Sequence, residues 1–120
     1  MIPSSYLETT YFLAKLIPIE NNTFFSINDF ISSTAIEPFI SEKTEKIVFY
    51  LDNKKIKITN GITFLLIDDK VYQLSSKVVK SKNEYFVDLD SFSTIINTSF
   101  ENFTITSNSS EIIISSNSKR

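Results

Sequence analysis

The feature that most constrains this fold is a change of hydrophobic period within one continuous stretch, residues 60–92. The stretch opens with two apolar runs, residues 62–67 and 71–74, which flank the polar triplet Asp68-Asp69-Lys70. Both runs are rich in β-branched and aromatic residues, and the triplet tolerates the dihedral angles of a tight turn. This part of the stretch therefore predicts a β-hairpin.

A second hairpin is predicted directly afterwards, with residues 77–80 turning through residues 81–83 into residues 84–87. The spacing of the apolar residues then lengthens to that of one helix face: Leu89, Phe92, Ile95 and Ile96. Asp88 stands where a carboxylate accepts the first unpaired N–H groups of a helix. We therefore expect a short helix over residues 89–97.

The N-terminal half shows a similar order of signals. Residues 11–20 are apolar and predict a strand, in which Pro18 favours an edge or a bulge. Asn21-Asn22 predicts a two-residue turn because asparagine tolerates positive φ. Residues 23–25 then predict the returning strand.

Ser26 is placed to cap a second short helix, which we expect over residues 27–34. Its buried face is predicted to be Ile27, Phe30 and Ile31. Further strands are predicted at residues 36–41 (interrupted by Pro38), 47–51 and 55–59, the last two joined through Asp52-Asn53.

The two halves also match in sequence. Residues 21–30 align without a gap with residues 83–92, and three apolar positions coincide: Phe24 with Phe86, Ile27 with Leu89, and Phe30 with Phe92. We interpret this as an internal duplication of a hairpin–helix–hairpin unit, with repeats at residues 11–59 and 62–115. The predicted fold class is α+β, one domain over residues 1–120, with antiparallel sheet curled around two short helices.

The C-terminal residues complete the predicted second repeat. Residues 103–107 and 112–115 predict a last hairpin that turns at residues 108–110, and residues 116–120 are expected to be frayed. The β-branched residues 112–114 are candidates for an exposed sheet edge through which copies of the chain pair.

Composition excludes several functional classes. The net charge of −2 supplies no basic field for nucleic acid. The chain has no histidine and no cysteine, which removes the usual general base and the usual zinc and copper ligands. Its single glycine excludes a glycine-rich phosphate loop. We therefore expect no enzymatic activity and no cofactor. No apolar run is long enough to predict a transmembrane segment.

The run over residues 60–97, read as N-G-I-T-F-L-L-I-D-D-K-V-Y-Q-L, then V-V-K-S-K-N-E-Y-F-V-D-L-D-S-F and I-I-N, resembles the copper amine oxidase N-terminal-like domain, and the match covers nearly the whole of residues 1–120. Residues 86–89 stand for the tetrapeptide that opens the family's helix, with Asp88 in place of a proline, and residues 25–27 form a weaker first copy. The resemblance implies an antiparallel sheet curled around short helices. It also implies a non-catalytic domain, attached in bacteria to cell-wall amidases and other exported envelope proteins.

The residue types offer candidates for two kinds of ligand site, one for a cation and one for a sugar. The carboxylates of Asp68, Asp69, Glu84, Asp88 and Asp90 are of the type that binds hard cations. A hairpin turn and a helix cap explain them better, so we predict no metal site. Tyrosines stack on sugar rings at carbohydrate sites, which makes Tyr72 and Tyr85, with Tyr50 beside them, candidate ligand contacts. The alternative is ordinary cross-strand packing.

The lysine group of residues 77, 80 and 82 is interpreted as a solvated turn. The expected function is then a non-catalytic accessory domain of a bacterial cell-envelope protein. Such a domain binds cell-wall polymer, or it positions a neighbouring catalytic domain such as an N-acetylmuramoyl-L-alanine amidase. The alternative is a structural module that pairs through sheet edges, so self-association is also considered. The resemblance implies an extracellular or cell-envelope location, with peptidoglycan or another envelope protein as partner.

Overall fold

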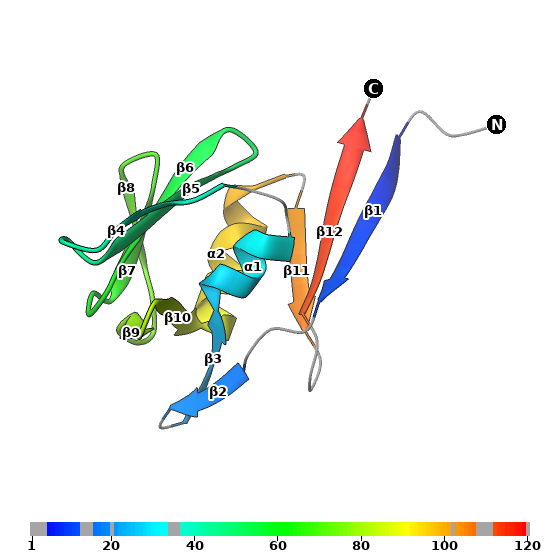
Figure 1. Ribbon diagram of the computed structural model, residues 1–120. Helices are drawn as coiled ribbons and strands as arrows, with labels where there is room; N and C mark the ends of the chain where they lie inside the picture. The colour runs from blue at the N-terminus through cyan, green and yellow to red at the C-terminus, as the bar shows by residue number, and fades with distance from the viewer. Residues whose placement is uncertain are drawn as a thin grey trace.

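The computed structural model describes residues 5–12, 16–19, 21–33, 37–101, 103–107 and 112–119 (Figure 1). These residues form antiparallel sheets and the helices α1 (Ile27–Ser33) and α2 (Leu89–Ser99), as the α+β expectation required. The strands are β1 (Ser5–Phe12), β2 (Leu16–Ile19), β3 (Asn22–Ser26), β4 (Phe39–Ser41), β5 (Lys46–Leu51), β6 (Lys54–Thr59), β7 (Phe64–Ile67), β8 (Lys70–Gln73), β9 (Val79–Ser81), β10 (Glu84–Asp88), β11 (Phe103–Ser107) and β12 (Ile112–Lys119).

The strands β4 to β8 form one sheet in sequence order, called here the meander sheet. Its tight turns are at Asp52-Asn53, with φ of 50° and 68°, and at Asp68-Asp69, with φ of 49° and 71°. Positive φ at both central residues defines the turn whose twist matches paired antiparallel strands. Aspartate and asparagine reach that region at lower cost than most residues. Both predicted hairpins are confirmed.

The central sheet has the order β2-β3-β10-β9, and each of its two inner strands runs directly into a helix. The Ser26 Oγ accepts the backbone N–H of Asp29 at 3.2 Å, and the Asp88 Oδ2 accepts that of Ser91 at 2.8 Å. Both predicted N-caps are confirmed, and so are both helices. Pro18 lies on β2, which is an edge strand as predicted.

Two boundaries in the N-terminal half differ from the prediction. Residues 11–20 are not one strand, because β1 ends at Phe12 and β2 begins at Leu16 in another sheet. The ladder pairs Ile19 with Asn22, so Asn22 already belongs to β3 and is not a turn residue as predicted. Continuous apolar character marks strand-forming residues but carries no signal for the point at which a chain changes sheets.

The terminal sheet has the order β1-β12-β11. The prediction of a frayed tail is wrong, since β12 continues to Lys119, which pairs with Ser5. Residues 112–114 are not a sheet edge either, because β12 lies between β1 and β11. The polar tail has low strand propensity, and a partner from the other end of the chain supplies its ladder. The predicted turn at residues 108–110 lies outside the described residues.

One core joins the helices to the sheets. Phe30 of α1 and Phe92 of α2 meet with ring centroids 5.5 Å apart, and Phe30 also contacts Phe49 of β5 at 6.2 Å. The predicted helix faces are confirmed as buried, since Ile27, Ile31, Leu89, Ile95 and Ile96 all belong to this core. In Figure 1 the helices lie between the meander sheet and the terminal sheet. The two helices therefore share one core.

The central sheet has an approximate two-fold arrangement. Three ladder pairs describe it: Ile17 with Phe24, Val79 with Phe86, and Phe25 with Val87. The 62-residue offset that aligns the two halves maps the first pair onto the second. The similarity covers β2-β3-α1 and β9-β10-α2. The strand after α1, β4, belongs to the meander sheet, whereas the strand after α2, β11, belongs to the terminal sheet. Duplication of residues 11–59 and 62–115 stays a hypothesis.

Candidate binding cavity at Tyr85

Tyr85 lies on β10 at the point where that strand leaves its neighbour β3. The β3–β10 ladder begins only at Phe86, so the Tyr85 N–H has no strand partner on that side. It donates instead to the side-chain Oδ1 of Asn28, on α1, at 2.9 Å. On the other side Tyr85 pairs with Lys80 of β9. The residue is thus held by two strands and a helix, and it is fully buried.

The phenol of Tyr85 lacks a polar partner. Its oxygen is buried and makes no hydrogen bond within the part of the chain that the structure describes. Burial raises the pKa of Tyr85 above its ordinary value of 10.0, and the carboxylates of Glu45 and Glu42 raise it further. A buried hydroxyl left unpaired costs about 1–3 kcal/mol, and such groups are rare in folded proteins. The phenol therefore has an unused hydrogen-bonding capacity in the folded chain.

A cavity of about 270 Å³ lies at this residue. It is lined by Ile40, Glu42, Lys80, Asn83 and Tyr85. These side chains come from β4 and the turn after it, and from the β9–β10 hairpin. The volume is just below the range of about 300–1,000 Å³ typical of sites for drug-sized molecules. The cavity suits one small group, such as a single sugar ring or one side chain.

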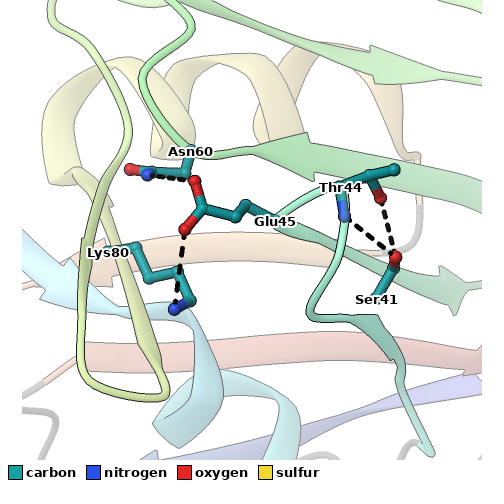
Figure 2. A network of polar contacts seen from close by, with 5 residues as sticks. All are labelled: Ser41, Thr44, Glu45, Asn60 and Lys80. Carbon is teal, nitrogen blue, oxygen red and sulfur yellow. Dashed lines mark hydrogen bonds and ion pairs between the residues drawn. The ribbon is translucent and has the colours of Figure 1, made fainter.

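A group of polar contacts near this cavity includes Lys80, one of its lining residues (Figure 2). Glu45 accepts the side-chain Nδ2 of Asn60 at 3.0 Å, and its other oxygen lies 3.8 Å from the Lys80 Nζ. Ser41 Oγ accepts both the N–H and the hydroxyl of Thr44, at 3.3 Å and 2.7 Å. The Glu45–Lys80 pair joins the β4–β5 turn to the β9–β10 hairpin, and the Glu45–Asn60 contact joins the same turn to the segment after β6. A partly exposed ion pair contributes little stability, so these contacts mainly set geometry.

The structure separates the tyrosines that the sequence grouped. Tyr85 lines the cavity, whereas Tyr72 lies half-buried on β8, packs against the core and does not line it. Tyr50 is 58% exposed on β5. The prediction of a solvated lysine turn holds for Lys77 and Lys82, which are exposed. It does not hold for Lys80, whose side chain is only 21% exposed and pairs with Glu45.

Sequence reasoning missed the other cavity residues, Ile40, Glu42 and Asn83. They belong to turns and an edge strand that are far apart in sequence, and no local spacing connects them. The available signal was weak: an apolar residue next to a charged turn, and an asparagine in a hairpin that also carries a tyrosine.

Three of the acidic residues considered as metal ligands, Asp68, Asp88 and Glu84, accept hydrogen bonds within the protein. Asp68 Oδ1 accepts the backbone N–H of Lys55 at 2.9 Å, and Asp88 caps α2. Glu84 accepts the hydroxyl of Ser26 at 3.2 Å. Within the described ranges, no group of three or more histidine, cysteine, aspartate or glutamate side chains is arranged to hold a metal ion.

A second cavity, of about 440 Å³, lies at the first turn of α2 and includes Asp90, Ser91 and Ser75 in its lining. Ser91 already donates its hydroxyl to Asp88 and accepts the N–H of Ser75 at 2.9 Å. The polar groups of this helix end are thus largely satisfied within the protein. The Tyr85 cavity differs in that one of its lining residues has a buried hydroxyl that is unpaired within the described residues.

Comparison with known proteins gives no relative: no family model, curated protein or solved structure matches this chain. Among the described residues, no helix has the length and apolar character needed to cross a membrane. A functional assignment therefore depends on the pattern of residues 60–92 and on the geometry of the Tyr85 cavity.

Proposed function

We propose that this chain is a non-catalytic accessory domain of a bacterial cell-envelope protein and that it binds cell-wall polymer through the Tyr85 cavity. The resemblance of residues 60–92 to the copper amine oxidase N-terminal-like domain supports the envelope context. In that context a neighbouring domain, such as an N-acetylmuramoyl-L-alanine amidase, carries out the catalysis. The accessory domain keeps that neighbour close to its polymeric substrate.

The observation that carries the proposal is a cavity of single-sugar size lined by Tyr85, a residue whose buried phenol is unpaired within the described residues. A sugar residue offers hydroxyl and acetamido groups that accept and donate hydrogen bonds, together with an apolar face. The cavity supplies matching chemistry: Asn83 both donates and accepts, Glu42 accepts, and Lys80 donates. Ile40, which is 41% exposed, supplies an apolar wall.

We propose that binding moves the buried Tyr85 side chain enough for its phenol to donate to a ligand in the cavity. A carbonyl or hydroxyl oxygen of the ligand accepts the Tyr85 O–H, which removes the cost of the unpaired group. The gain is larger than for a surface hydroxyl, because the phenol has already lost its contact with water on folding. A polymer fits this arrangement if one ring enters the cavity and its neighbours stay outside, beside the Glu45–Lys80 pair.

The test is co-sedimentation with purified peptidoglycan. We expect the wild-type chain to sediment with the polymer and Tyr85→Phe to bind about 3- to 10-fold more weakly, as the loss of one hydrogen bond predicts. Tyr72→Phe is the matched control, since it removes a tyrosine hydroxyl outside the cavity and should bind like wild type. Failure of the wild-type chain to sediment, or equal binding by Tyr85→Phe, contradicts the proposal.

A second candidate function, assembly through sheet edges, is favoured by the outer strands of the meander sheet. Phe39 on β4 is 68% exposed and Val71 on β8 is 62% exposed, and both strands have an open edge in this sheet. Sedimentation velocity over a range of concentrations tests this candidate. Assembly through these edges predicts concentration-dependent association that is lost in Phe39→Lys or Val71→Lys, while peptidoglycan binding is unchanged.

A further inference from the structure

The meander sheet has a second face, opposite the core, that differs in charge from the rest of the protein. Alternation along β5 and β6 buries Ile47, Phe49, Ile56 and Ile58 and turns the intervening residues outward. The charged residues on this outer face are Lys46, Lys55 and Lys57, and the described outward positions of β4 to β8 include no carboxylate. The whole chain, in contrast, carries a net charge of −2.

Apolar side chains surround these lysines. The registers align one row across all strands of the sheet: Phe39, Val48, Lys57, Leu66 and Val71. Tyr50, which is 58% exposed, stands opposite Lys55 in the neighbouring row. No described element packs on this face, and Figure 1 shows the helices on the opposite side of the sheet. Positive charge and exposed apolar area thus occupy one open surface.

The distances between these lysines match the distances between alternate residues of an extended polypeptide. Lys55 and Lys57 are alternate residues of β6, so their Cα atoms lie about 7 Å apart. Lys46 pairs with Thr59 and is therefore diagonal to Lys57, again at about 7–8 Å. Carboxylates on alternate residues of an extended polypeptide have the same spacing. Apolar side chains beside those carboxylates would contact Val48, Tyr50 and Leu66.

We infer that the outer face of the meander sheet binds an extended acidic segment of a partner protein that also carries apolar side chains. Charge complementarity selects an anionic partner, and the apolar rows select one with hydrophobic groups. A nucleic acid fits less well, because the net negative charge of this chain repels a polyphosphate at long range. This surface is separate from the Tyr85 cavity and does not depend on the function proposed above.

Fluorescence anisotropy with a labelled peptide of alternating glutamate and leucine tests the inference on the full chain. We expect saturable binding that weakens as salt is raised from about 50 to about 200 mM, because exposed charges are screened over that range. Lys57→Gln should weaken binding several-fold, and Lys57→Glu should weaken it at least about 10-fold. Lys43→Glu, which makes the same charge change in the exposed β4–β5 turn, should leave binding unchanged.

Three outcomes overturn the inference. The first is absence of peptide binding, and the second is an equal loss in Lys43→Glu and Lys57→Glu. The third is tighter binding of a single-stranded oligonucleotide than of the peptide. Binding at a sheet edge is also distinguished, because Lys57 lies on β6 inside the sheet and its replacement should not affect an edge. Urea midpoints of all variants confirm that folded proteins are compared, and Lys57→Gln retains a long polar side chain if Lys57→Glu is unstable.

Discussion

At the scale of single residues, Tyr85 is fully buried, and its phenol has no hydrogen-bond partner among the described residues. The backbone of this residue is fully held by Lys80 and Asn28, whereas its phenol is unpaired within the described residues. Its position costs folding free energy that a ligand can return. The proposed binding mode therefore predicts that this one oxygen lowers stability and strengthens binding.

The raised pKa of Tyr85 predicts a dependence of stability on pH. A tyrosine whose pKa is higher in the folded than in the unfolded chain is held in its neutral form by folding. Its contribution is therefore constant below the unfolded pKa, about 10, and is lost as pH rises above it. We expect the urea midpoint of the wild-type chain to fall further between about pH 8 and pH 11 than that of Tyr85→Phe. Other tyrosines and lysines act on both proteins, so the difference reports Tyr85.

Two results would contradict this expectation. If Tyr85→Phe loses stability in the same way as the wild-type chain, the phenol does not ionise differently in the two states. If Tyr85→Phe is less stable than wild type near pH 7 by more than about 1 kcal/mol, the phenol has a hydrogen-bond partner in the fold.

At the scale of elements, the tight turns determine how neighbouring strands of the meander sheet are connected. The turn residues Asp52, Asn53, Asp68 and Asp69 all have positive φ, and each turn residue pair directly joins two neighbouring strands. For a residue other than Asn, Asp or Gly, the left-handed backbone conformation costs more free energy. The identity of the turn residue should therefore matter even where its side chain is solvated.

We predict opposite effects of two substitutions at Asp69, whose φ is 71°. Asp69→Gly relieves backbone strain and completes the Asp-Gly pair that is favoured in such turns, so stability should be unchanged or slightly higher. Asp69→Ala keeps a Cβ without the local hydrogen bonding of aspartate and should cost about 1 kcal/mol. Urea midpoints at an unchanged m-value measure both. Equal stability of the two variants would mean that the turn relaxes to another conformation.

The elements differ in how far their structure could be predicted from the sequence. The helices and most of the hairpins were predictable, because caps, turn residues and apolar period act within a few residues of one another. The pairing of Ser5 with Lys119 was not, since the polar residues 115–119 have low strand propensity and the ladder exists only once the two ends of the chain meet. The Tyr85 cavity shares this limit: Tyr85 itself was a candidate, but Ile40 and Glu42 reach it only through tertiary structure.

At the scale of the whole molecule, α1 and α2 share one core. Phe30 and Phe92 touch each other, and both contact Phe25 of β3, at 6.4 Å and 5.4 Å. Two independent repeats would each bury their own phenylalanine. The observed contact makes the two halves energetically dependent, whatever their evolutionary origin.

A double-mutant cycle measures this dependence. Phe30→Leu and Phe92→Leu should each destabilise by roughly 1–2 kcal/mol through loss of packed volume. The double variant should differ from the sum by about 0.5–3 kcal/mol, as residues in direct contact do. Leucine keeps each variant folded enough for urea titration. Strict additivity would show that the phenylalanines stabilise separate units.

The pairing of β1 with β12 sets the mechanical behaviour of the domain. Ser5 and Lys119 are opposite each other in an antiparallel ladder, and Figure 1 shows the start of β1 beside the end of β12. Tension applied at these two residues would open the ladder one hydrogen-bonded pair at a time. Strands pulled from opposite ends must instead break many such bonds together. Tension across Ser5 and Lys119 would therefore detach β1 at low force, before the helices and their shared core are disturbed.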